Sequence, residues 1–380
     1  MNEKISALYS EYVIDGIAQD LTPDRILSAC LATPVPKTDR GHFDPVVDES
    51  VDPALKPCVT DPSMIDEYVE RVKTVPERVF PIAFPETYTK SRIACALVDA
   101  IWRQGHFRLD DLALKLDWKW NPRRIGDMTA FYSSVYSAAD YTDSLGIKLS
   151  GYSYSGTEGE SGLDVSAALA SERSSEDEDD FFDELPFRTE HPQLGDSPAH
   201  PSELVPDPQS WIIYIPFENC EYRLGASLLA QVLEVSGAVA PQILDADYFI
   251  DCYEVVRELV EDGIVLSGAT VGEGGLMSAL TSMTNGGTGA AVELSDLVLA
   301  AHEPDIVRLL FSEVPGVIIQ IADIDYDYVD AELLLQDVAF YPLGHPVPGD
   351  SAVKVRASGK TGIQTILESL IRSQSSEGED

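Results

Sequence analysis

The second half of the chain alternates buried-strand runs with helical patterns, and this alternation restricts the possible folds more than any other feature of the sequence. From residue 211 to about 370, the apolar runs WIIYIPF, IVLSGATV and GVIIQIAD are separated by segments with apolar residues at helical spacing. Glycines follow several of these helical segments, as expected where a helix ends in a left-handed residue. This order predicts an α/β domain with a mixed sheet.

A shorter patterned stretch precedes it, from residue 80 to about 154. It contains a helical pattern around SRIACALVDAIW, an alternating strand at 112–120, an amphipathic helix ending at Gly146 and a short strand after that helix. Upstream, a helical pattern at 5–17 leads into a Pro- and Asp-rich run. We therefore expect a partly extended N-terminal arm before the first patterned stretch.

Residues 155–208 differ in composition from both patterned stretches. They contain the run SSEDEDDFFDELPF, with Arg173 and Arg188 as the only basic residues. We expect a flexible acidic insert here, with a docking motif as the alternative. The expected organisation is an arm (1–79), a first subdomain (80–154), the insert (155–208), a second subdomain (209–372) and a tail (373–380).

The charge of the chain excludes several classes of partner. Its 380 residues hold 26 Lys and Arg against 65 Asp and Glu, a net charge of -39. Because phosphate binding needs clustered basic residues, we expect no nucleic acid and no anionic membrane as partner. Solubility through self-repulsion, including adaptation to a salty cytoplasm, is the simpler explanation of the acidity, and a cationic partner is the alternative.

Targeting and redox signals are equally sparse. The chain contains no apolar run long enough for a membrane span and begins without a secretory pattern, so a cytoplasmic location is expected. Five cysteines are scattered without a CxxC pair, which argues against a disulfide framework or a zinc site.

The strongest chemical signal is the strand–glycine–helix junction IVLSGATVGEGGLMSAL. Glycines such as Gly272, Gly274 and Gly275 let the backbone approach a ligand, and the helix start offers N–H groups to an anion. A tight turn without a ligand is the alternative.

Ordered blocks around this junction resemble the C-terminal half of phosphoribosylformylglycinamidine (FGAM) synthase, of the AIR synthase-related superfamily. They include YRLGASLLAQVLEVSG, DIVRLLFSEVPGVIIQIAD and, upstream, LKLDWKWNPRRIGDMTAFYSSVYSAADYTDSLGIKLSG. The resemblance covers roughly residues 80–370, interrupted by the insert. It implies two α/β subdomains with mixed sheets, and an ATP-dependent ligase of purine biosynthesis that amidates formylglycinamide ribonucleotide with Mg and ATP.

The sequence departs from the family where metal is bound. The helix that carries a metal-binding Glu and Asn in the family has Cys95 and Asp99 at those places. Where the family shows His-Asp-x-Ser-Asp-Gly-Gly, the aspartate positions hold Thr270 and Glu273. Asp99 and Glu273 are therefore the candidate metal ligands.

A further departure concerns phosphate. Tyr152 and Ser153 stand where the family has a Lys and an Asp in a phosphate-contacting loop. Loss of this Lys together with metal-binding carboxylates removes the charges on which phosphoryl transfer depends. Arg123 or Arg124 could compensate from the loop before the second helix.

Other positions of the family pattern are retained, although no catalytic residue can be assigned. A turn, a helix cap and a surface carboxylate are the structural alternatives for these positions. The candidate substrate- or nucleotide-binding residues are Gly225, Ser227, Glu273, Gly274, Gly275, Ser312 and Glu313.

These observations favour a degenerate FGAM-synthase-like half with a structural or regulatory role. In this superfamily two such halves pair through their sheets, so we expect an exposed apolar sheet face, and a homodimer formed through strand 112–120 or a complex with another FGAM-synthase-related chain. One alternative is an active subunit that completes a composite site or uses Asp99 and Glu273. The other is a binding module whose acidic insert recruits a basic partner.

Overall fold

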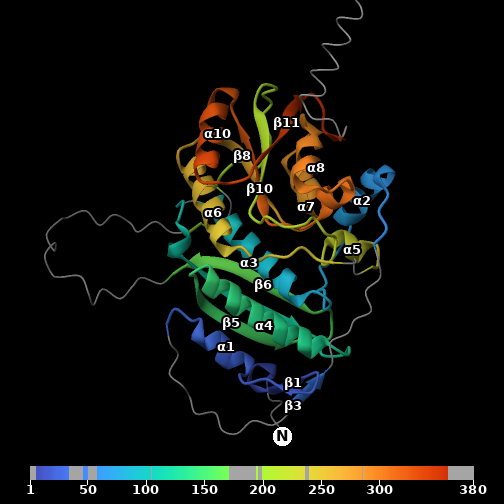
Figure 1. Cartoon of the computed structure of the whole chain (residues 1–380), viewed down its shortest axis with the longest axis vertical. Helices are drawn as coiled ribbons and strands as arrows, with labels where there is room; N and C mark the ends of the chain where they lie inside the picture. Colours follow the sequence, from blue (N-terminus) through green and yellow to red (C-terminus); the bar gives the residue numbers. More distant parts are fainter. Residues whose placement is uncertain are drawn as a thin grey trace, which may run out of the picture. The chain divides into compact units, whose positions relative to one another are not determined.

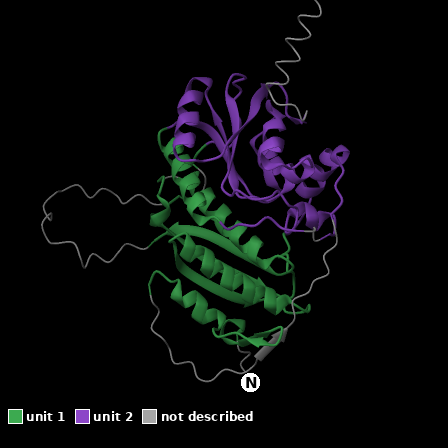
Figure 2. Cartoon of the chain, viewed as in Figure 1, with its two compact units in different colours: residues 1–54, 78–200, 245–262 green, residues 55–77, 201–244, 263–380 purple. Residues whose placement is uncertain are grey.

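Two compact units make up the chain. The computed structural model describes residues 6–33, 46–49, 58–103, 105–170, 194–195, 199–235, 239–284 and 286–357. Unit 1 comprises Met1–Ala54, Arg78–His200 and Asp245–Asp262, and unit 2 comprises Leu55–Glu77, Pro201–Leu244 and Gly263–Asp380 (Figure 2). Both contain helices and mixed sheets, which confirms the predicted fold class. The acidic run at 171–193 and the tail at 373–380 lie outside the described residues.

A three-stranded sheet lies at the centre of the described part of unit 1. Strand β4 (Leu112–Trp120) pairs in parallel with β5 (Lys148–Gly156) and antiparallel with β6 (Gly162–Leu169). Helices α3 (Pro85–Ile101) and α4 (Asp127–Ser144) pack on each other and against the sheet (Figure 1). The strand and both helices confirm the periodicity of the sequence.

The tryptophans of β4 are core residues. Trp118 and Trp120 are fully buried. Their indole N–H groups donate to Ser134 Oγ at 3.0 Å and to the Asp127 carbonyl at 2.9 Å, so each large ring is buried without an unsatisfied polar atom.

Smaller elements complete unit 1. A second sheet has the strand order β2-β1-β3, and helix α1 packs on α4. The bounds are η1 (Ala7–Tyr9), β1 (Glu11–Ile14), β2 (Ile17–Ala18), α1 (Pro23–Ala29), β3 (Val46–Glu49), η3 (Leu109–Asp111) and α6 (Ala246–Glu261).

The helix expected at 5–17 is wrong. Asp15 and Gly16 both have positive φ, at 50° and 78°, and form the turn of a hairpin between β1 and β2. An Asp-Gly pair favours such a turn because both residues tolerate the left-handed conformation. Tyr12 is buried and donates from its hydroxyl to the Ala7 carbonyl at 3.0 Å, which fixes the segment locally.

The flexible insert expected from residue 155 is also wrong at its start. Strand β5 continues to Gly156, and β6 adds an edge strand to the sheet. Leu163 and Ala167 are buried on β6, although its small and polar residues give little strand signal. Pairing with β4 therefore stabilises a segment whose own propensity is low.

The expected apolar sheet face is wrong on β4, whereas the homodimer stays a prediction, although not one formed by strand addition to β4. Both edges of β4 are already paired within the chain, so no partner strand can add there. The face away from the tryptophans carries Lys115, Asp117 and Lys119. Lys115 pairs with Asp117 at 2.8 Å and Lys119 with Asp164 at 3.1 Å. This face is polar and internally charge-paired.

Unit 2 contains a six-stranded mixed sheet in the order β12-β9-β11-β7-β10-β8. Neighbouring strands are antiparallel except β12 and β9, which are parallel. The strands are β7 (Trp211–Pro216), β8 (Val265–Val271), β9 (Thr288–Glu293), β10 (Gly316–Ile321), β11 (Tyr341–Pro348) and β12 (Val353–Arg356). The helices are η2 (Pro62–Met64), α2 (Ile65–Lys73), α5 (Leu228–Val232), α7 (Gly275–Met283), α8 (Ser295–Ala301), α9 (Ile306–Phe311), η4 (Asp323–Asp325) and α10 (Tyr326–Leu335).

Helices flank this sheet on both sides. Figure 1 shows α7 and α8 on one side of the strands and α10 on the other. Every residue of β10 is buried, as the continuous apolar run of its sequence predicts. The buried side-chain amide of Gln320 is satisfied by Ser267, Ser210 and the backbone of Val205. In the described part of the chain, no helix is long and apolar enough to cross a membrane.

Candidate functional site

The strand–glycine–helix junction lies in unit 2, where β8 leads into α7. Gly274 is the N-cap of α7 with φ 75°, and Gly275 follows with φ 67°. A Cβ atom on Gly275 would lie 2.7 Å from the carbonyl oxygens of Leu310 and Ser312. Gly275 is therefore required for the close approach of α7 to the end of α9.

A buried glutamate joins three of the sequence blocks at this junction. Glu313 is 8% exposed, and its Oε1 accepts hydrogen bonds from Leu228 N at 2.6 Å and Gly274 N at 2.9 Å. These N–H groups belong to the starts of α5 and α7, where the helix dipole favours a negative charge. The chain itself thus supplies an anion at the position where a ligand phosphate was expected.

The other retained residues of unit 2 also make internal contacts. Ser227 is the N-cap of α5, and its Oγ accepts from Ala230 N at 3.1 Å. Ser312 Oγ accepts from Arg223 N at 3.1 Å and donates to its carbonyl at 2.7 Å. A Cβ atom on Gly225 would lie 2.4 Å from the Val239 carbonyl oxygen. Each residue has a structural role at this position.

The carboxylates proposed as metal ligands lie in different units. Asp99 is exposed on α3 in unit 1, one helical turn after the half-buried Cys95. Glu273 is exposed in unit 2, just before α7, and Thr270 lies on β8, the edge strand of the sheet. Among the residues that the structure describes, no three His, Cys, Asp or Glu side chains are grouped as metal ligands.

This donor set does not fit the magnesium ion that the family resemblance implies. Mg²⁺ prefers carboxylate and other oxygen ligands in octahedral geometry. A thiol at Cys95 and a hydroxyl at Thr270 replace two of the carboxylates of the family pattern. No reaction step through Mg·ATP is therefore derived for this chain.

Tyr152 and Ser153 on β5 make hydrogen bonds to carboxylates of unit 1. The Tyr152 hydroxyl donates to Asp24 Oδ1 at 3.1 Å, and Ser153 Oγ donates to Asp117 Oδ1 at 2.6 Å. Partial burial raises the pKa of Asp117, but hydrogen bonds from Lys115 and Ser153 outweigh it and hold that pKa below its ordinary value. Both hydroxyls act as donors to acidic groups, and Tyr152 supplies no positive charge at the position where the family has a Lys.

The arginines considered as replacements are paired with acidic residues. Arg123 lies 3.9 Å from a Glu158 oxygen. Arg124 contacts Asp127 and Glu160, each at 3.5 Å. Phosphate binding by either arginine would compete with these carboxylates.

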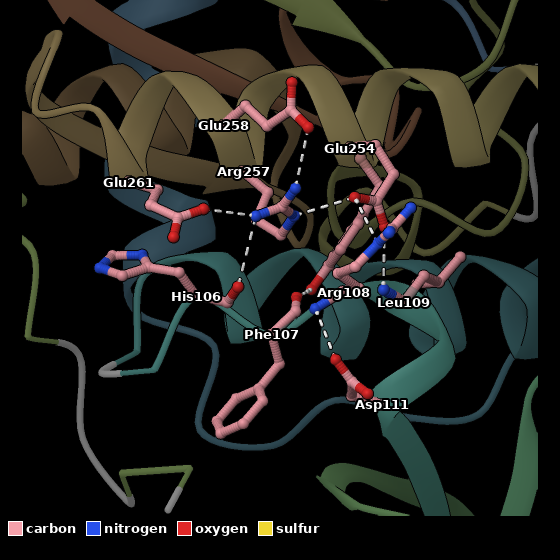
Figure 3. Close-up of polar contacts among 10 residues, drawn as sticks. His106, Phe107, Arg108, Leu109, Asp111, Glu254, Arg257, Glu258 and Glu261 are labelled. Carbon is pink, nitrogen blue, oxygen red and sulfur yellow. Dashed lines mark hydrogen bonds and ion pairs between the residues drawn. The ribbon is translucent and has the colours of Figure 1, made fainter. Parts of the chain in front are cut away.

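Arg257 on α6 forms a charged cluster that the sequence reasoning missed. Its side chain is 7% exposed and contacts Glu254 at 2.9 Å, Glu258 at 3.0 Å and Glu261 at 2.7 Å (Figure 3). Glu254 also accepts from Leu109 N at 3.0 Å, so α6 is tied to the segment before β4. The i−3, i+1 and i+4 spacing of the glutamates was a usable signal, because the i−3 and i+4 positions share one helix face with the arginine.

Known proteins with similar sequences include FGAM synthases. The chain is 22% identical over 282 residues to a probable FGAM synthase of Arabidopsis thaliana, described as chloroplastic/mitochondrial. The aligned region covers 73% of this chain and 18% of that protein. It is 28% identical over 172 residues to FGAM synthase of Drosophila melanogaster, in a region that covers 42% of this chain and 12% of that protein. The chain thus spans less than a fifth of the length of these relatives. No protein-family model matches the chain.

The fold has a counterpart among solved structures. Thermotoga maritima PurL complexed with FGAR superposes with a TM-score of 0.51 at 14% identity, covering 74% of this chain and 43% of that chain. The fold is accordingly AIR-synthase-like. The chain is therefore similar in sequence to FGAM synthases and in fold to a PurL structure.

Proposed function

We propose that this chain is a non-catalytic relative of FGAM synthase with a structural or regulatory role in purine biosynthesis. The observation that carries the proposal is the loss of charged groups where the resemblance places metal and phosphate. The hydroxyls of Tyr152 and Ser153, which stand at two of these positions, donate to carboxylates of the same unit. The retained Glu313 already occupies the N–H groups of Leu228 and Gly274. A site for Mg·ATP needs the opposite arrangement, in which N–H groups and cations face the phosphates.

The proposed partner is another FGAM-synthase-related chain in the cytoplasm. A homodimer that buries the open face of the unit 1 sheet would desolvate Lys115, Asp117 and Lys119 on both copies. The polar character of this face therefore favours a partner of different sequence over a second copy. Sedimentation velocity of the purified chain at micromolar concentration is expected to show a monomer, and a stable dimer would contradict this choice of partner.

A turnover assay tests the lack of activity. The purified full chain is mixed with ammonia, ATP, Mg²⁺ and formylglycinamide ribonucleotide, and ADP release is followed beside an active FGAM synthase. We expect no turnover above background. Turnover that disappears in Glu273→Gln would overturn the proposal and identify an active enzyme with altered ligands.

The exposed carboxylates of Asp99 and Glu273 keep the composite-site alternative open to test. If a partner chain supplies the missing ligands, turnover should appear only in the mixture of the two chains and should be lost in Asp99→Asn or Glu273→Gln. The alternative of a binding module, in which the acidic insert recruits a basic partner, is tested with a deletion confined to residues 171–193. A deletion of 155–208 would also remove β6 and would damage the sheet of unit 1.

A further inference from the structure

Helix α10 of unit 2 is apolar on the side that faces solvent as well as on the side that faces the core. Val329 and Leu333 are fully buried and anchor the helix. The outward side chains Ile324, Tyr328, Leu334 and Leu335 are 88%, 45%, 65% and 79% exposed. We call these four residues the α10 face.

The α10 face is continuous because of helical spacing. Tyr328 and Leu335 are seven residues apart, with the exposed Ala331 between them at i+3, so these three lie on one side of the helix. Leu334 adjoins this row because it follows Ala331 by three residues. Ile324 lies four residues before Tyr328, in the short helix η4 that leads into α10. Isolated exposed apolar residues are common on soluble proteins, but contiguous ones indicate an interaction site.

Aromatic rings lie beside this surface. The half-exposed Trp211 ring lies 4.9 Å from the Tyr326 ring and 4.2 Å from the His345 ring, measured between centroids. Its Nε1 donates to Asp323 Oδ1 at 2.8 Å, which fixes its orientation. Tryptophan and tyrosine held in one orientation are typical of the energetic centre of protein interfaces.

Aspartates surround the apolar residues. Asp323, Asp325, Asp327 and Asp330 lie on η4 and α10, and among the described residues Asp325, Asp327 and Asp330 have no Lys or Arg within ion-pairing distance. Burial, and after it the charges of Asp330, Asp296 and Asp327, raise the pKa of Tyr326. Acidic residues stabilise a helix start, which accounts for some of these aspartates but not for the apolar face beside them.

We propose that the α10 face binds a segment of another protein that presents apolar side chains flanked by Lys or Arg. The apolar residues would cover Leu334 and Leu335, and the basic residues would pair with Asp327 and Asp330. Arginine fits best because it pairs with carboxylates in a planar geometry and stacks on aromatic rings such as Trp211.

Charge complementarity selects this occupant over the other possibilities. A second copy would bring the same aspartates against each other in a chain of net charge -39. An anionic membrane surface would be repelled for the same reason. A basic, apolar protein segment is the occupant that both the aspartates and the apolar residues attract.

Peptide binding tests the proposal on the full chain. Three labelled amphipathic peptides share one leucine pattern and differ only in their flanking residues, which are all Arg, all Gln or all Glu. Fluorescence anisotropy is expected to rank their affinities Arg, Gln, Glu, with at least about a tenfold difference between the first and the last. Equal affinities, or no binding of the Arg peptide, would overturn the proposal.

Variants locate the binding site, because any basic peptide is attracted to an acidic chain. Leu334→Ser with Leu335→Ser should weaken the Arg peptide about tenfold without changing the melting temperature. The control Ile125→Ser removes an 85% exposed residue of unit 1 and should change nothing. Unchanged affinity in the double variant would place binding elsewhere and contradict the proposal.

A second pair of variants tests the acidic rim. Asp327→Asn with Asp330→Asn should weaken the Arg peptide and reduce its salt dependence, and should leave the Gln peptide unchanged. If the variant changes neither the affinity for the Arg peptide nor its salt dependence, the proposal of a basic partner is refuted. A dimer in sedimentation velocity that dissociates in the Leu334→Ser, Leu335→Ser variant would instead show that a second copy covers the face, and would equally refute it.

Discussion

The junction at Glu313 and the α10 face belong to the same unit but differ in how far their side chains and backbone groups are covered or paired within the chain. At the junction, the backbone N–H groups of Leu228 and Gly274 are occupied by a carboxylate of the same chain. On α10, Leu335 and its neighbours remain uncovered. The polar groups of the junction are thus satisfied within the chain, whereas the α10 face leaves large apolar side chains exposed. This contrast supports the two proposals made above, that the chain does not bind the family's ligands and that it presents a surface for a partner.

The largest effect is expected from a variant that disturbs the close approach of α7 to the end of α9 at the junction. Gly275→Ala places a methyl group against two carbonyl oxygens at a positive φ, so we expect a loss of about 4 kcal/mol in the free energy of unfolding. Urea denaturation measures it. Gly263→Ala is the control, since Gly263 has a similar φ of 72° but open space around it, and should cost about 1 kcal/mol. Equal losses in the two variants would show that the approach of α7 to α9 is not tight.

Removal of the internal anion tests the other half of the junction. Glu313→Ala leaves two buried N–H groups without an acceptor and should cost about 3 kcal/mol. Thermal unfolding followed by circular dichroism measures the change. Glu273→Ala, which removes an exposed carboxylate close by, should stay within about 0.5 kcal/mol. A destabilisation by Glu273→Ala as large as that by Glu313→Ala would contradict the assignment of Glu313 as the structural group.

Unit 1 offers a parallel case of a buried charge satisfied within the chain. Arg257→Met removes the partner of Glu254 and of the other glutamates around it (Figure 3). Because these carboxylates are partly exposed, we expect a loss of about 2 kcal/mol, less than for a fully buried pair. Lys73→Met breaks an exposed pair with Glu70 and should change stability by less than about 0.5 kcal/mol in the same urea titration. If Arg257→Met leaves the free energy of unfolding unchanged, α6 is held by its apolar face alone.

The smallest effect concerns the polar face of the unit 1 sheet. Since the pKa of Asp117 is lowered in the folded state, its contribution is complete above the unfolded pKa of about 4 and is lost as the pH falls through the folded pKa. Asp117→Asn should therefore cost about 0.5 kcal/mol at pH 6. The difference from the unmodified chain should shrink below pH 4, and urea titrations at both pH values measure it. A difference that grows as the pH falls would contradict a lowered pKa of Asp117 in the folded state.

The sequence predicted those elements whose pattern is long and strong. Strands β4, β7, β8 and β10 and helices α3, α4 and α6 all follow from apolar periodicity. The hairpin at Asp15 and Gly16 was missed although its turn residues are visible, because a short helical pattern was given more weight. Strand β6 could not be predicted, because its stability comes from pairing with β4 and not from its own residues.

The site was less predictable than the fold. Ser227 as a helix cap follows from local sequence alone. Glu313 was predicted as a substrate- or nucleotide-binding residue, with a surface carboxylate as the alternative. Its donors come from residues 85 and 39 positions away in the chain, and only the tertiary structure brings them together. The apolar outer side of α10 is visible in the sequence as YDYVDAELLL, yet its exposure depends on how the helix packs. Where the role of a residue depends on distant partners, the sequence alone does not determine it.

Calorimetric titration of the full chain with Mg·ATP, and with Mg·ADP beside it, tests the central claim most directly. The positions that the family resemblance assigns to metal and phosphate hold Cys95, Thr270, Tyr152 and Ser153 in place of charged ligands. The loss of two carboxylates and a lysine, each a charge-assisted contact of about 1.5 to 3 kcal/mol, should weaken binding by several orders of magnitude. The account predicts no measurable heat of binding at micromolar protein. Saturable binding that is lost in Asp99→Asn or Glu273→Gln would contradict it.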